Sequence, residues 1–272
     1  MAPRSGTAKI LSSKKKDKDF SYHSAVFLVR QCAAEYGWSD LSQDTVMDVG
    51  CGSKLNVCNV ILKEFPEVKA LIAVEKGPSV FQKLKRIDKR IKCSTINILK
   101  RESLHDFEGD VDKVISTDTL NTIFNKKYFF ENIYRLLKPG GQAAFLFILD
   151  CWYDNFLTAL LEIPKFNRLK NGLYSKNMYP KEHRRQYYER MLKEIGFEYV
   201  VSKEVNRKNL PPSDEEWKDV LYESYKHVFE IPAESVEEIK EEAYQIYVTK
   251  IEKHEKYCHR VLMLILLAKK PF

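Results

Sequence analysis

The sequence has 272 residues, of which 44% are hydrophobic and 31% charged, so it can form one large domain or two small ones. The most apolar run, residues 261–268, is too short to cross a bilayer and suits a buried strand. The six cysteines lack paired spacing, the six histidines are scattered, and no apolar segment follows the basic N-terminus. These features argue against a secreted, disulfide-rich or membrane-spanning protein, predict no metal site, and favour a cytoplasmic protein with reduced thiols.

The net charge of +7 is concentrated at the N-terminus. Residues 1–19 hold six basic and two acidic side chains, a charge of +4, in a segment rich in serine and lysine. This composition predicts a flexible tail without a packed core. We favour a solubilising tail, and the alternative is a contact with nucleic acid or a membrane surface.

From residue 20 to residue 149, short apolar runs alternate with amphipathic stretches, the pattern of a parallel sheet with crossover helices. In chain order this part predicts a helix over 20–36, a strand over 45–49, a helix over 55–65, a strand over 69–75, a short helix over 79–87, strands over 93–99 and 111–117, a helix over 128–137 and a strand over 142–149. Gly37, Pro66 and the Lys138-Pro139-Gly140-Gly141 turn mark the ends of three of these helices.

The alternation breaks after residue 149. The later elements, in chain order, are an apolar and aromatic stretch over 152–161, a loop-like stretch through Pro180, a helix over 181–195 closed by Gly196, a strand over 197–205, two helices and a last strand over 260–268. Ser213 with Glu216, and Ser235 with Glu238, have the spacing of capping boxes and predict where the two unplaced helices begin.

Together these elements predict an α/β fold, a Rossmann-like, seven-stranded and mostly parallel sheet with helices on both faces. Residues 20–272 are predicted to form a single domain, because no linker or internal repeat divides them. Within it we expect a ligand-binding core over 45–149, with helical insertions at about 150–196 and 209–256 that form a cap over the carboxyl edge of the sheet.

The most informative motif is the loop Asp48-Val49-Gly50-Cys51-Gly52 together with Glu75. Glycines let the chain turn sharply from strand to helix, and an acidic residue after the next strand is placed to accept hydrogen bonds from ribose hydroxyls. A dinucleotide fingerprint needs a third glycine where this chain has Leu55, so a pyrophosphate is poorly supported. Two glycines alone also suit a plain turn, but the acidic residues at both strand ends favour a nucleoside site.

This loop, Glu75, the turn at 138–141 and the closing strand resemble class I S-adenosylmethionine-dependent methyltransferases, with the cofactor-binding core over 45–149. Within that superfamily the chain is similar to the arthropod juvenile hormone acid methyltransferases. The similarity lies in the overall length, the Cys-Gly loop, Thr119-Leu120 ahead of the run Asn132–Leu137, and the run Met191–Phe197.

The resemblance implies S-adenosylmethionine as the cofactor and assigns positions around it. The methionine and sulfonium end would lie at the glycine loop, the ribose at Glu75, the adenine edge at Asn97 and Ile98, and the region between cofactor and acceptor at Thr117 and Asp118. The implied cofactor-binding set is Asp48, Gly50, Cys51, Gly52, Glu75, Asn97, Ile98, Thr117 and Asp118.

The chain departs from the family pattern at four residues. Lys54 stands where a further glycine is usual, so its side chain either swings outward or occupies cofactor space. Asn121-Thr122 stands where the hormone methyltransferases have His-Trp, and Asn97 stands where an aspartate is more common.

The resemblance implies methyl transfer to a small apolar carboxylic acid of the sesquiterpenoid type, such as farnesoic or juvenile hormone acid. A carboxylic acid with a pKa of about 4.3 is already ionised at neutral pH, so no general base is needed. We expect no single catalytic side chain, and Tyr22, His23, Asn121 and Trp152 are candidates to position the acceptor. Trp152 either roofs an apolar acceptor pocket or belongs to the core of a cap helix.

Three alternatives stay open at this point. The acceptor is another small molecule, or it is RNA, or the chain is an inactive binding or scaffold member of the fold. The basic cluster over 83–92 would suit RNA, but it is equally typical of a solvated helix face, and no aromatic residues are interleaved with its basic ones. The sequence indicates no oligomeric state.

Overall fold

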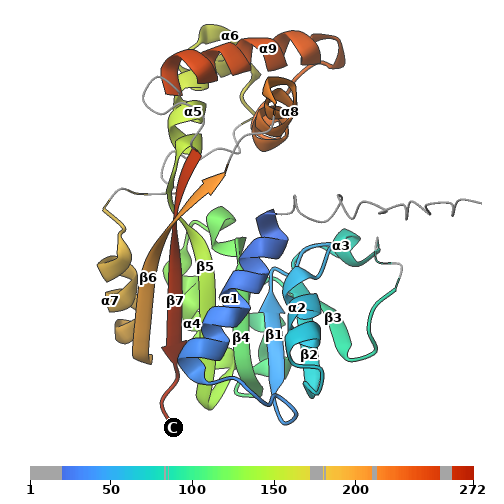
Figure 1. Cartoon of the computed structure of the whole chain (residues 1–272), viewed down its shortest axis with the longest axis vertical. Helices are drawn as coiled ribbons and strands as arrows, with labels where there is room; N and C mark the ends of the chain where they lie inside the picture. Colours follow the sequence, from blue (N-terminus) through green and yellow to red (C-terminus); the bar gives the residue numbers. More distant parts are fainter. Residues whose placement is uncertain are drawn as a thin grey trace, which may run out of the picture.

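A computed structural model describes residues 20–82, 84, 86–171, 180, 182–209, 213–251 and 259–272. Seven strands form one sheet in the order β3-β2-β1-β4-β5-β7-β6 (Figure 1). The strands are β1 (Thr45–Val49), β2 (Ala70–Glu75), β3 (Ile91–Thr95), β4 (Val111–Thr117), β5 (Leu137–Cys151), β6 (Glu198–Asn209) and β7 (His259–Lys269). The predicted seven-stranded, mostly parallel sheet is confirmed, and the predicted tail over 1–19 lies outside the described residues.

The first five strands are parallel, and the chain order reverses between β1 and β4. From β1 the sheet grows outward through β2 and β3 on one side and through β4 and β5 on the other. β7 runs antiparallel to both β5 and β6. In such a sheet a ligand binds beyond the carboxyl ends of the strands at the point of reversal, which here lies between β1 and β4.

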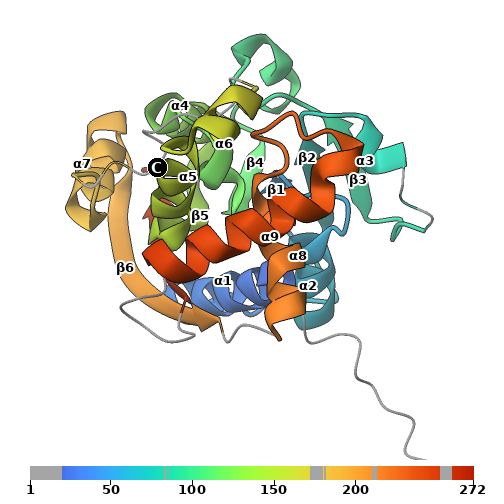
Figure 2. The same cartoon turned by 90° about the horizontal axis from the view of Figure 1, so that it is seen from above.

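Helices cover both faces of the sheet. The helices are α1 (Phe20–Tyr36), α2 (Asn56–Glu64), α3 (Ser79–Gln82), α4 (Lys126–Leu136), α5 (Trp152–Leu161), α6 (Pro164–Leu169), α7 (Arg185–Ile195), α8 (Asp214–Tyr225) and α9 (Val236–Ile246). α1 and α2 lie on one side of the sheet, and α4 and α7 on the other (Figure 2). Each side encloses its own apolar core, because the buried strands of a parallel sheet carry apolar side chains on both faces.

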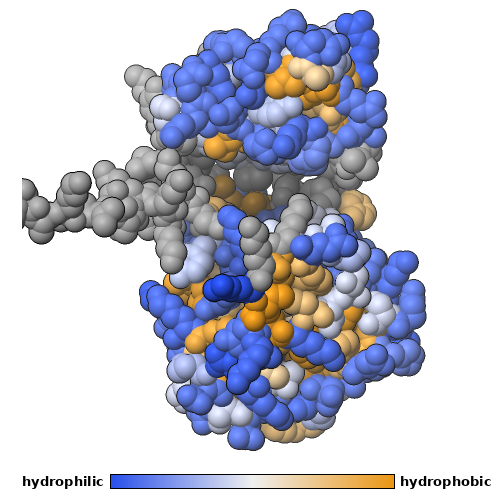
Figure 3. Space-filling view, turned by 90° about the vertical axis from the view of Figure 1, so that its right-hand side faces the viewer, coloured by the Kyte–Doolittle hydropathy of each residue, from blue (hydrophilic) through white to orange (hydrophobic). Residues whose placement is uncertain are grey.

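Helices α5, α6, α8 and α9 form a cap that stands above the carboxyl edge of the sheet (Figure 1). The cap has a separate apolar core that includes Phe156, Phe166, Trp217, Tyr225 and Tyr247. On the side of the cap seen in Figure 3, most residues are hydrophilic and surround a smaller hydrophobic patch. α5 continues directly from β5, and α8 follows β6, so the cap is tied to the sheet edge at the ends of these strands.

Several element boundaries differ from the predicted ones. β3 ends at Thr95, two residues before Asn97, and residues 138–141 belong to β5, where a register shift follows Val111 of β4. α7 begins four residues later than predicted and packs against the sheet with α4, outside the cap. Ser213 caps α8 by accepting a hydrogen bond from the Glu216 amide at 3.5 Å, but Ser235 makes no side-chain cap to α9.

Among the described residues, no helix is both long and apolar enough to span a membrane. The same residues contain no group of three or more histidine, cysteine or acidic side chains arranged to hold a metal ion.

Candidate active site

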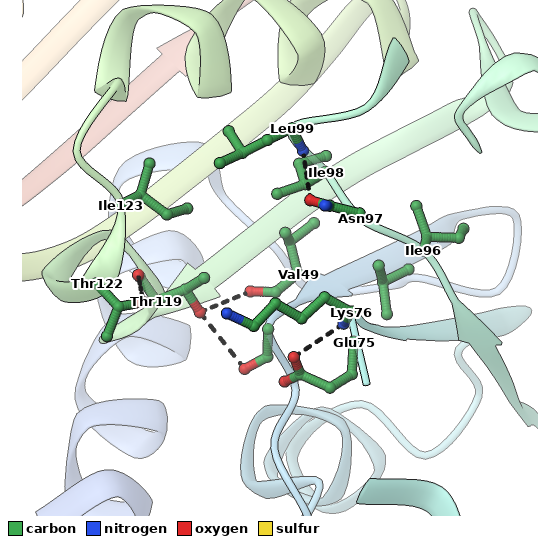
Figure 4. Close-up of a pocket in the computed structure, with 12 residues that line it drawn as sticks. Val49, Glu75, Lys76, Ile96, Asn97, Ile98, Leu99, Thr119, Thr122 and Ile123 are labelled. Carbon is green, nitrogen blue, oxygen red and sulfur yellow. Dashed lines mark hydrogen bonds between the residues drawn. The ribbon is translucent and has the colours of Figure 1, made fainter. Parts of the chain in front are cut away.

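A cavity opens at the carboxyl ends of β1 and β2, beside the loops that follow β3 and β4 (Figure 4). It encloses about 660 Å³ of empty volume, part of it open to solvent, which is within the usual range for ligand pockets. We call it the cofactor cavity. Its wall is formed by Val49, Gly50, Val74, Glu75, Lys76, Ile96, Asn97, Ile98, Leu99, Thr119, Thr122 and Ile123.

Glu75 ends β2 at the floor of this cavity. Its Oε1 atom accepts a hydrogen bond from the Lys76 amide at 2.9 Å, which holds the carboxylate against its own backbone. The Lys76 side chain extends from Glu75 toward Thr119 across this end of the cavity (Figure 4). A carboxylate held in this position can accept further hydrogen bonds, as a pair of ribose hydroxyls would supply.

Asn97 and Ile98 form the opposite wall in the turn after β3. Asn97 Oδ1 accepts a hydrogen bond from the Leu99 amide at 3.0 Å, and the Ile98 carbonyl accepts one from Asn132 Nδ2 of α4 at 2.7 Å. These bonds fix the turn from both sides, and they leave the apolar side chains of Ile98 and Leu99 along the cavity. Such a wall suits the flat face and polar edge of a base.

The glycine loop follows β1 and is locked to the loop after β4. Gly50 has a φ of +77°, and a side-chain Cβ there would lie 2.7 Å from Thr119 Cγ2 and still closer to Oγ1. Thr119 Oγ1 in turn donates to the Val49 carbonyl, with 3.1 Å between the two oxygens. Gly52 also has a positive φ of +61°, but a Cβ there would meet nothing within 4 Å. The exposed Lys54 is not part of the cavity wall.

Asp48 is buried under the loop in β1. One carboxylate oxygen accepts a hydrogen bond from Cys58 Sγ at 3.5 Å, and the other oxygen is buried without a hydrogen-bond partner among the described residues. Burial raises the pKa of Asp48 to about 7. The structure thus holds a carboxyl group that is poorly solvated and poorly compensated, directly behind the cofactor cavity.

Asp118 follows β4 in a left-handed backbone conformation, with a φ of +62°. Both of its carboxylate oxygens are buried, and neither reaches full hydrogen-bond geometry with a described residue. Burial raises the pKa of Asp118 to about 6, while Ser24, Arg207 and Asn121 lie close enough to offset part of that rise. A buried anion in a strained conformation is typical of functional sites.

Arg207 of β6 reaches α1 beside Asp118. Its guanidinium donates to Ser24 Oγ at 3.0 Å and to the His23 carbonyl at 3.4 Å, and it lies 5.2 Å from the ring centroids of both Phe20 and Phe27. Burial lowers its pKa. A half-buried guanidinium framed by aromatic rings and next to a carboxylate makes a site for a polar group with an apolar body.

The remaining candidates for positioning the acceptor are spread over three places. Tyr22 packs on the α1 side of the sheet, with the ring of exposed His23 6.3 Å away. Asn121 Oδ1 accepts a hydrogen bond from the Ile148 amide at 2.7 Å, which ties the loop after β4 to β5. Trp152 packs against the apolar core of the cap, with its ring 5.4 Å from the Tyr247 ring. This is the position expected if Trp152 belongs to the core of a cap helix.

Of the nine predicted cofactor residues, four line the cofactor cavity: Gly50, Glu75, Asn97 and Ile98. Asp48, Cys51, Gly52, Thr117 and Asp118 are not part of that wall, but each lies within two residues of a wall residue in the chain. Sequence reasoning did not assign Lys76 or Thr119 to the site, although Thr119 belongs to a motif of the family resemblance and both residues lie close to strand ends. It also missed Arg207, because β6 was predicted to end at Val205.

Comparison with known proteins agrees with this geometry. The family described as "Methyltransferase domain" matches residues 40–244. A sterol 24-C-methyltransferase of Pneumocystis carinii is 24% identical over 172 residues, which cover 62% of this chain and 43% of that protein, so the match spans less than half of its length. These values describe similarity in sequence.

Two solved structures show similarity in fold. The YcgJ protein of Bacillus subtilis superposes with a TM-score of 0.58 at 13% identity, covering 92% of this chain and 99% of that one. Phosphoethanolamine N-methyltransferase 2 of Haemonchus contortus, solved with phosphomonomethylethanolamine and S-adenosylhomocysteine, superposes with a TM-score of 0.54 at 16% identity, covering 92% of this chain and 53% of that one. At these identities the likeness extends to the fold alone.

Proposed function

The chain belongs to the methyltransferase domain family, an S-adenosylmethionine-dependent class of enzymes, and we propose that it methylates a small apolar carboxylic acid. Farnesoic acid and juvenile hormone acid are examples of this acceptor class. The observation that supports a carboxylic acid as the acceptor is the half-buried Arg207 guanidinium, which lies between Phe20 and Phe27 beside the loop after β4. The free thiols of Cys32, Cys51, Cys58 and Cys93 support a cytoplasmic location.

The residues around the cofactor cavity fit S-adenosylmethionine, which carries a positive sulfonium and a positive ammonium. Asp118 offers two buried carboxylate oxygens without full hydrogen bonds, and a cation beside them would compensate the cost of their burial. Glu75 would hold the ribose, and Asn97 and Ile98 the adenine. The exposed Lys54 leaves the cavity wall clear, so its replacement of a glycine does not fill the proposed site.

When bound, S-adenosylmethionine supplies an electrophilic methyl group carried on a sulfonium sulfur. The chain's own residues then have two tasks. Arg207 binds and orients the acceptor carboxylate, and the Phe20 and Phe27 rings cover its apolar body and exclude water. The acceptor is ionised at neutral pH and needs no base, so we assign no catalytic residue to proton transfer.

Measurement of methyl transfer from labelled S-adenosylmethionine tests this proposal. We expect label in the methyl ester of farnesoic acid and none in farnesol, because the alcohol carries no negative charge for the Arg207 guanidinium to bind and orient. Arg207→Gln is expected to raise the KM for the acid by about tenfold or more, since it removes a charge-assisted contact. The dissociation constant for S-adenosylmethionine, from isothermal titration, should stay within about twofold of that of the wild type.

Arg185→Gln is the matched control, because Arg185 is a surface arginine that pairs with Glu189 on α7. Its KM should equal that of the wild type. Label in bulk RNA or in an amine, with none in any acid, would overturn the acceptor class. No binding heat with S-adenosylmethionine at about 1 mM would overturn the cofactor assignment for this chain.

A further inference from the structure

Lys76 places a positive charge in a cavity wall that otherwise carries little charge. Of the described residues that line the cofactor cavity, Lys76 is the only basic one and Glu75 the only acidic one. The other lining residues are apolar side chains, a glycine, two threonines and an asparagine. In such a wall the few polar and charged groups determine how a bound molecule is oriented.

The two charged side chains point to different places. The Glu75 carboxylate accepts a hydrogen bond from the Lys76 amide at 2.9 Å. The Lys76 side chain extends away from this contact, across the end of the cavity and toward Thr119 (Figure 4). Its ammonium makes no ion pair with any residue that the structure describes. It can therefore pair with an anion that enters the cavity.

The direction of Lys76 leads to the glycine loop, because Thr119 Oγ1 lies 3.4 Å from the Gly50 carbonyl oxygen. In the proposed function the adenine lies at Asn97 and the ribose at Glu75. The methionine part of the cofactor then continues from the ribose toward the glycine loop. The ammonium of Lys76 extends along the same path.

The methionine part of S-adenosylmethionine carries positive charges and one negative charge, which is its α-carboxylate. The two buried carboxylate oxygens of Asp118 suit the positive groups. The carboxylate needs a basic partner, and a lysine ammonium forms a charge-assisted hydrogen bond with such a group. The other basic side chain close to Asp118 is Arg207, whose guanidinium already donates to Ser24 Oγ at 3.0 Å on the α1 side.

We propose that Lys76 binds the α-carboxylate of the cofactor and makes the cavity select adenosyl ligands that carry this group. The inference rests on the cofactor positions of the proposed function and is independent of the acceptor. It gives Lys76 the role of a specificity-determining residue that contacts the cofactor away from the reacting methyl group.

Isothermal titration of the whole chain with two ligands tests this role. S-adenosylhomocysteine carries the carboxylate, and its decarboxylated form, S-adenosyl-3-thiopropylamine, differs by that group alone. We expect Lys76→Met to weaken S-adenosylhomocysteine by about fivefold or more and Lys76→Glu to weaken it further, because a reversed charge repels the carboxylate. Neither variant should weaken the decarboxylated ligand. Lys100→Met is the matched control, since exposed Lys100 follows Leu99 without lining the cavity, and it should leave both affinities within about twofold.

Equal losses for both ligands in Lys76→Met would show that Lys76 acts on the nucleoside or on the loop, and unchanged affinities would show that it acts on neither ligand. Each of these results overturns the proposal. Binding of the decarboxylated ligand by Lys76→Met at wild-type affinity also shows that the cavity of the variant is intact.

Arg207→Gln tests the other basic side chain and should leave both affinities within about twofold. If Arg207→Gln weakens S-adenosylhomocysteine and Lys76→Met does not, the carboxylate lies at Arg207, and both this proposal and the acceptor site are wrong. Failure of the acceptor class alone shows in the label transfer and leaves these titrations unchanged. If the wild type binds neither ligand at about 1 mM, the cofactor positions are wrong and the proposal falls with them.

Discussion

Two glycines in the loop after β1 have the same backbone handedness but different surroundings. Gly50 and Gly52 both have positive φ, whereas only at Gly50 would a Cβ collide with Thr119. We predict that Gly52→Ala costs about 1–2 kcal/mol, the usual strain of a left-handed residue, and that Gly50→Ala costs clearly more. Urea unfolding measures both, and the same variants titrated with S-adenosylmethionine should show weaker binding for Gly50→Ala.

A Gly50→Ala variant as stable as Gly52→Ala would contradict this prediction. It would mean that the loop after β4, which contains Thr119, moves away from residue 50 at little cost in folding free energy. In that case the hydrogen bond from Thr119 Oγ1 to the Val49 carbonyl would not determine the shape of the cofactor cavity.

Among single residues, the sequence predicted the site residues that can be recognised from their immediate neighbours in the chain. Gly50 and Glu75 follow buried strands at the spacing of a nucleoside site, and both line the cavity. Asp118 was assigned by resemblance, but nothing in the sequence predicted its strained backbone or its unpaired oxygens. Arg207 lies 183 residues from the serine it contacts, and only the folded sheet brings them together.

The cap helices α8 and α9 provide a matched pair at the level of elements, because both begin after a serine with a glutamate three residues later. Ser213 caps α8 through the Glu216 amide, whereas Ser235 makes no such bond to α9. We predict that Ser213→Ala destabilises the protein by about 0.5–1 kcal/mol and that Ser235→Ala has almost no effect. Thermal unfolding measures both, and equal losses would show that α9 is capped as its sequence first suggested.

Element boundaries were predictable where local sequence determines them, and not where backbone geometry or a distant contact does. The strands and helices of the core have strong apolar periodicity, and β1 matches its predicted range residue for residue. Ser235 lies instead at the end of a short 3₁₀ turn over Ala233–Ser235, a backbone geometry that its sequence does not reveal. β6 extends four residues beyond its predicted end because it pairs with β7 as far as His259, a contact distant in sequence.

At the scale of the whole molecule, two buried carboxyl groups should shape how stability depends on pH. Burial raises the pKa of Asp48 to about 7 and that of Asp118 to about 6, whereas both are near 3.8 when solvated. Below the solvated value, both groups are protonated in the folded and unfolded chain. As pH rises toward the folded value, the unfolded chain ionises first, so the folded state loses stability until about pH 7.

We therefore predict that the wild type loses stability between pH 5 and pH 7 and that Asp48→Asn reduces this loss by about 2 kcal/mol. Asn keeps an acceptor for Cys58 Sγ and cannot ionise. Asp118→Asn should remove about 1 kcal/mol, since the pKa of Asp118 is raised less. Urea unfolding at several pH values measures the slopes, and comparison with the wild type cancels the contribution of histidines common to all three proteins. Identical slopes in the wild type and Asp48→Asn would mean that Asp48 is ionised in the folded chain throughout this range, with a compensating positive group closer than the described residues place one.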